Sequence, residues 1–87
     1  MKYIATKTEK GVEEIFTFPY DVHHDCMMEM LGFIKDQNGG QWSRVYREAI
    51  SAGFVDSTGH CHGKSETLGL KSRPTADTAL LKKQLGG

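Results

Sequence analysis

The residues of this sequence that could do chemistry fall into two short windows. His23-His24-x-Cys26 and His60-Cys61-His62 together contain all four histidines and both cysteines of the chain. Imidazole and thiolate groups bind zinc, carry protons and act as nucleophiles. These two windows are therefore where a metal centre or an active site would have to lie.

A zinc site would need two ligands from each window. On a helix, His23 and Cys26 are three positions apart and share a face. On a strand, His60 and His62 share a face. Because side chains alternate along a strand, Cys61 would point to the opposite face from His60 and His62. The sequence also contains no Cys-x-x-Cys motif of the kind found in zinc knuckles. We therefore predict no cofactor or metal site and keep a Cys/His zinc-binding domain as an alternative, with His23, Cys26, His60 and His62 as its candidate ligands.

An enzyme would use Cys26 as a nucleophile with His23 as its base. The helical phase places Cys26 on the apolar face, where burial raises a thiol pKa and denies access to a substrate. The sequence also lacks a glycine-rich phosphate loop near these residues. We predict no catalytic activity and no catalytic residues.

The composition fits one small domain, residues 1–87. A hydrophobic content of 38% supports a thin core, and the net charge of zero argues against general binding to nucleic acid or membrane surfaces. Residues 1–43 carry 4 Lys or Arg against 7 Asp or Glu, whereas residues 44–87 carry 7 against 4. The N-terminus does not resemble a secretion signal and no apolar run is long enough to span a bilayer, so a cytoplasmic location with reduced thiols is expected.

The first half of the chain predicts a β-hairpin and a helix. Residues 3–6 and 12–18 are rich in β-branched and aromatic side chains, and Gly11 supplies the turn. A helix over 22–35 would follow, with Asp21 as its N-cap and Met28 pointing to solvent. The residues expected on its apolar face are Val22, His23, Cys26, Met27, Met30, Leu31, Phe33 and Ile34.

The second half contains an ambiguous segment, residues 41–57. Its apolar spacing fits a helix over 43–51, which would give a winged-helix-like DNA-binding regulator, the second alternative function. The segment also fits a long strand that turns at Thr58-Gly59 into an alternating run over 60–70, before a helix that starts at Pro74. We choose the strand. The prediction is an α+β fold, ββαββα, with a mainly antiparallel four-stranded sheet and both helices on one face.

Part of the second half resembles small uncharacterised proteins of phages and prophages. The resemblance covers residues 50–85 and rests on the segments at 51–55, 61–65 and 68–74 and on Asp77-Thr78-x-Leu80-Leu81. It implies a cytoplasmic accessory protein of a bacterial host or its virus, and it brings no catalytic residues.

An interaction module remains as the predicted function. Aromatic residues and arginine dominate the hot spots of protein interfaces. The interaction candidates are Trp42, Arg44, Tyr46 and Arg47. A thin core, an open sheet edge and oppositely charged halves also predict a homodimer, with an unidentified host or phage protein as the partner.

Overall fold

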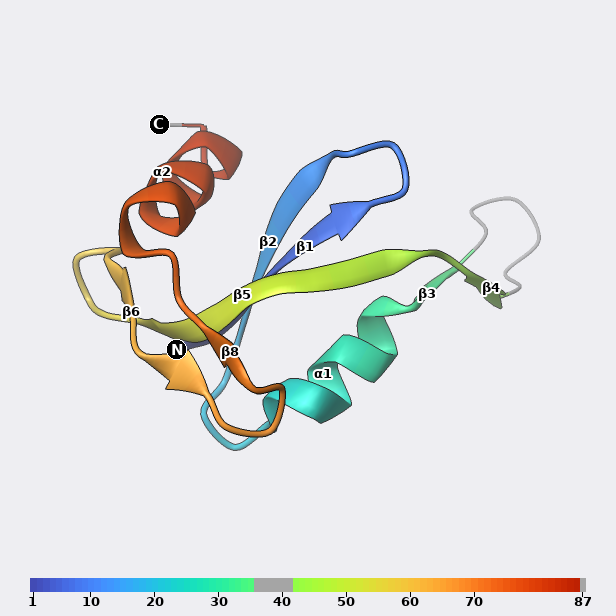
Figure 1. Cartoon of the computed structure of the whole chain (residues 1–87), viewed down its shortest axis with the longest axis horizontal. Helices are drawn as coiled ribbons and strands as arrows, with labels where there is room; N and C mark the ends of the chain where they lie inside the picture. Colours follow the sequence, from blue (N-terminus) through green and yellow to red (C-terminus); the bar gives the residue numbers. More distant parts are fainter. Residues whose placement is uncertain (36–41, 87) are drawn as a thin grey trace.

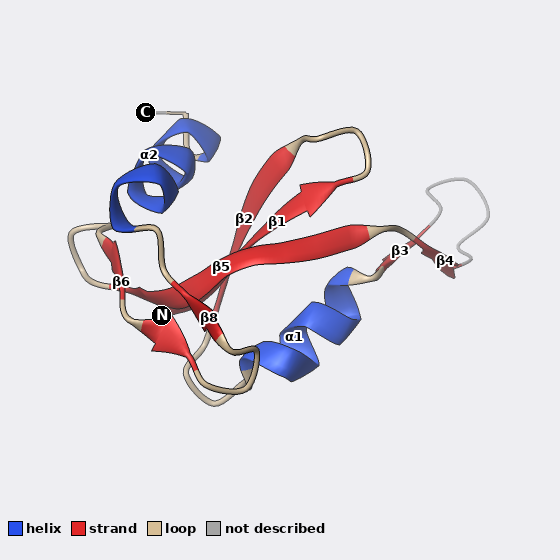
Figure 2. Cartoon of the chain, in the orientation of Figure 1, coloured by secondary structure: helices blue, strands red, loops and turns tan. Residues whose placement is uncertain are grey.

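The computed structural model describes the backbone at residues 1–35 and 42–86 and the side chains at residues 1–32 and 44–86. Figures 1 and 2 show its strands and helices. In chain order they are β1 (Lys2–Thr8), β2 (Glu13–Phe18), α1 (His24–Leu31), β3 (Phe33–Lys35), β4 (Trp42–Arg44), β5 (Arg47–Val55), β6 (Cys61–His62), β7 (Lys64–Ser65), β8 (Leu70–Lys71) and α2 (Pro74–Gln84).

The main sheet has four antiparallel strands in the order β2-β1-β5-β6. Strand β1 lies at its centre, between β2 and the nine-residue β5. The predicted strand in the ambiguous segment is therefore confirmed over Arg47–Val55, whereas residues 42–44 form the separate strand β4. The helix over 43–51, on which the winged-helix alternative depended, is wrong, because residues 43–44 pair with β3 and the residues from Arg47 onward lie in β5, which pairs with β1.

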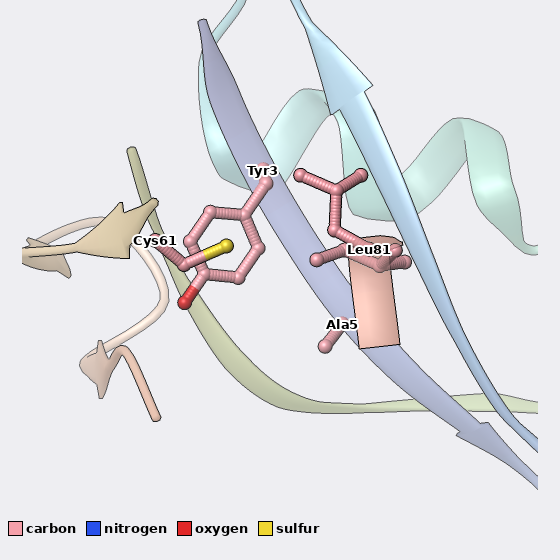
Figure 3. Close-up of a cluster of buried hydrophobic side chains, with 5 residues drawn as sticks. Tyr3, Ala5, Cys61 and Leu81 are labelled. Carbon is pink, nitrogen blue, oxygen red and sulfur yellow. The ribbon is translucent and has the colours of Figure 1, made fainter. Parts of the chain in front are cut away.

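Both faces of β1 are buried. Tyr3 and Ala5 pack in a cluster with Leu81 of α2, as Figure 3 shows, whereas Ile4 packs in a second cluster with Met27 of α1. Because successive side chains of a strand point to opposite faces, the two helices cover opposite faces of the sheet. The expectation that both helices lie on one face is wrong, since β1 is apolar on both sides and each side needs its own cover.

Helix α1 is shorter than predicted and turned differently. It spans His24–Leu31 with His23 at the N-cap, and no side chain caps it, so the predicted cap by Asp21 is wrong. His24 is 4% exposed, Met28 is partly buried, and Met30 is 66% exposed. The chain turns at position 32 into β3, which pairs with β4. Asn38, Gly39 and Gly40, whose residue types predict a break in the chain after the helix, lie outside the described residues.

The chain after β5 follows the prediction only in part. The turn at Thr58-Gly59 is present, and Gly59 has the positive φ of 83° that such a turn favours. The single strand expected over 60–70 is instead divided at Gly63, so that β6 joins the main sheet while β7 and β8 form a separate ladder. Helix α2 starts at Pro74 as expected. The fold is thus α+β with an antiparallel four-stranded sheet, but two short ladders interrupt the simple ββαββα order.

The two edges of the main sheet are protected in different ways. Strand β6 is only two residues long. At the β2 edge, the amide of Gln84 accepts from the Ile15 N–H at 2.5 Å and donates to the Ile15 carbonyl at 2.9 Å. The last turn of α2 thus occupies backbone groups that a further strand would use.

Candidate functional site

The structure does not assemble the two His/Cys windows into one centre. His23 and Cys26 are exposed at the start of α1, and His60 and His62 are exposed around β6. Within residues 1–35 and 42–86, no group of three or more His, Cys, Asp or Glu side chains is arranged to hold a metal ion. The residues of the zinc alternative therefore do not form a ligand set in the described part of the chain.

The two cysteines have opposite environments. Cys26 is exposed, contrary to the expectation that it faces the core, while Cys61 is fully buried. Burial raises the pKa of the Cys61 thiol, and the nearby Asp77 carboxylate acts in the same direction. Cys61 therefore stays protonated and behaves as a small core residue.

A buried polar cluster joins the central strand to the last helix. The Asp77 carboxylate accepts from the Tyr3 hydroxyl at 2.5 Å and from the backbone N–H and Nε of Arg73 at 2.9 and 3.0 Å. Arg73 also contacts Glu13 at 2.9 Å. Burial, and then the Asp77 carboxylate, raise the Tyr3 pKa. Both carboxylate oxygens of Asp77 have partners, so the cluster fastens the fold together.

The start of α1 lies close to the residues that follow β6, and a cleft of about 430 Å³ separates them. Phe54 lines the cleft, and its ring lies 5.9 Å from the His24 ring and 6.2 Å from the His62 ring. The residues lining the cleft are Lys2, His23, His24, Phe54, Gly63, Lys64, Ser65, Glu66 and Thr67. Sequence reasoning did not identify this cleft, because its walls come from four separate segments.

Three of the four interaction candidates gather on one surface. Arg44, Tyr46 and Arg47 line two adjoining hollows of about 460 and 440 Å³, one beside α1 and the other beside the β1–β2 turn. The Trp42 backbone lies in β4, and its side chain is outside the described residues. The link between β4 and β5 therefore brings this sequence cluster to the rims of two depressions.

Arg47 and Tyr46 play different parts on this surface. The Arg47 side chain is only 14% exposed, contacts Glu14 at 2.8 Å, and lies 5.1 Å from the centre of the Phe16 ring. Tyr46 is 60% exposed, and Val12, on the rim of the same hollow, is 54% exposed. A fixed arginine beside an exposed aromatic residue is typical of protein-binding surfaces.

Neither helix in the described part of the chain combines the length and apolar character needed to cross a bilayer. Comparisons of the chain with protein-family models, with curated proteins and with solved structures found no match.

Proposed function

We propose that this chain is a small cytoplasmic protein of phage, prophage or bacterial origin that acts by protein–protein contact and not by catalysis. The observation that supports the proposal is the surface around Tyr46, where an exposed aromatic side chain stands between two hollows. A large aromatic side chain that is left 60% exposed gains little in the folded monomer and can be buried by a partner.

The arrangement of charges around Tyr46 favours a specific contact. Arg47 is held by Glu14 and by the Phe16 ring, so its guanidinium keeps one position. A side chain that is already ordered loses less conformational entropy when a partner binds. Tyr46 would then supply apolar area, and Arg47 would supply an oriented polar group at its side.

We propose that a second copy of the chain is one partner of this surface. Val12 and Tyr46 are both more than half exposed on the rim of one hollow, so a symmetric contact could bury both pairs. A dimer formed by pairing of sheet edges is less well supported. Gln84 occupies backbone groups of β2 at one edge, and β6 at the other edge is only two residues long.

The experiment compares the wild-type chain with Tyr46→Ser and Tyr20→Ser. Tyr20 is a matched control because it is 62% exposed but lines neither hollow. We expect light scattering after size exclusion to show a wild-type dimer at high concentration that Tyr46→Ser weakens and Tyr20→Ser preserves. Cross-linked complexes with a native partner should depend on Tyr46 in the same way. Equal behaviour of the two variants in both measurements would refute this surface as the binding site.

A further inference from the structure

The cleft at the start of α1 is lined by more basic than acidic side chains in the described part of the chain. Lys2 and Lys64 line it together with His23, and Glu66 is its single acidic side chain. The ion pairs of Arg47 with Glu14 and of Arg73 with Glu13 and Asp77 involve neither of these lysines. Within that part of the chain, neither lysine of the cleft is neutralised by a carboxylate.

A second observation points to an anion at this place. Lys64 lies directly opposite Lys71 in the β7–β8 ladder. Like charges at directly opposite positions of an antiparallel pair destabilise it. The ladder has only two residue pairs, so this like-charged pair is half of it. A bound anion beside Lys64 would relieve this repulsion.

The groups around the cleft also suit an oxyanion. The Lys2 ammonium donates to the Val22 carbonyl at 2.9 Å, which holds its charge at the cleft. Ser65 is 2% exposed, and its hydroxyl accepts from the Leu68 N–H at 3.3 Å and lies 3.3 Å from the Thr67 hydroxyl. Lysine ammonium and hydroxyl groups are the donors that proteins commonly use for phosphate.

The aromatic lining argues against recognition of a flat base. The Phe54 ring already has three ring neighbours, with Tyr20 stacked at 6.0 Å, His62 stacked at 6.2 Å and His24 edge-on at 5.9 Å. A further stacking partner would have to displace one of them. The recognition would therefore rest on the anionic group.

We propose that this cleft binds a phosphate dianion, either free or as the end group of a small phosphate monoester. Two lysines match the two charges of the dianion, and the hydroxyl pair of Ser65 and Thr67, which shares one of its two protons internally, can donate the other to the ligand. The inference goes beyond the proposed interaction function and uses a different surface, so either can fail without the other.

The test is a titration of the ¹⁵N-labelled chain with inorganic phosphate at constant ionic strength, maintained with sodium chloride. We expect saturable shifts of the amides at 63–67 and around His23, with a dissociation constant on the order of millimolar. Lys64→Gln should weaken binding about fivefold or more, because one close charge is removed. Glu66→Gln should tighten it, since a repelling charge is lost.

Lys83→Gln is the matched control, because Lys83 is an exposed lysine in the last turn of α2 and does not line the cleft. Two outcomes would overturn the proposal, because each would show general ionic screening and not a site. One is chemical shifts that fail to saturate with phosphate, and the other is an equal loss of phosphate affinity in Lys83→Gln and Lys64→Gln. Glycerol 3-phosphate separates the two sources of the ligand. If glycerol 3-phosphate binds more tightly than inorganic phosphate, the ligand of the cleft is a phosphate monoester. If it binds equally or more weakly, the ligand is the free phosphate ion.

Discussion

The side chain of His24 shows which of two adjacent histidines the fold buries. The His24 Nε2 donates to the Gly53 carbonyl at 3.0 Å. The His24 ring also packs edge-on against the Phe18 ring at 5.2 Å and the Phe54 ring at 5.9 Å. These contacts hold His24 inward, whereas His23 at the N-cap is exposed. Helical periodicity alone could not reveal this, because the contacts come from β2 and β5 of the sheet.

The burial of His24 makes stability depend on pH. Desolvation is the main cause that lowers the His24 pKa below its usual 6.5. The folded state then binds fewer protons than the unfolded state, so stability is complete above pH 6.5 and is lost as the pH falls from there toward the folded-state pKa.

We expect the free energy of unfolding, measured with urea, to decrease as the pH falls below about 6.5. His24→Gln should flatten this dependence, whereas His23→Gln should retain it because His23 is exposed at the N-cap. If the two variants show the same slope, His24 is not its source.

The interaction candidates that are neighbours in the chain also lie close together in space. Arg44, Tyr46 and Arg47 come from one short segment, and the structure places them on one surface. The Tyr3–Asp77 cluster joins residues 74 positions apart, and nothing in the local pattern pairs them. The cleft was missed for the same reason.

At the scale of elements, pairing partners outweighed local periodicity. The stretch at 43–51 has helical spacing, yet its first two residues pair with β3 as part of β4, and its residues from Arg47 onward belong to β5, which pairs with β1. The hairpin of β1 and β2 and the start of α2 at Pro74 were predicted correctly, because turn glycine and proline act locally. The side of the sheet on which each helix packs depends on the whole sheet, and that expectation was wrong.

The Gln84 side chain has a measurable role at the edge of β2. Gln84→Ala removes two hydrogen bonds to Ile15, and we expect a loss of about 1–3 kcal/mol of stability. The freed edge should also promote association into species larger than those of the wild type. Static light scattering over a concentration series would show this. Lys83→Ala, in the same turn, is the control, and identical association of both variants would contradict a protective role for Gln84.

At the scale of the whole molecule, one hydrogen bond connects the central strand with the last helix. Tyr3→Phe removes the hydroxyl that donates to Asp77, while the contacts of Asp77 with Arg73 remain. We expect a loss of about 1.5–3 kcal/mol, because the acceptor is a buried carboxylate. Tyr20→Phe, at a 62% exposed position, should change stability by less than about 0.5 kcal/mol. Equal midpoints of denaturation for the two variants would show that the hydrogen bond from Tyr3 to Asp77 adds nothing to stability.

The central position of β1 also has a consequence for how the chain folds. On the ribosome β1 is made before its partner β5, and long before α2, which covers one of its faces. Until those segments emerge, Tyr3 and Ile15 of the β1–β2 hairpin lack their native cover. Contacts between segments distant in sequence require closure of long loops, which slows folding. We therefore expect this domain to fold only after α2 has been synthesised, and more slowly than a helical bundle of equal length.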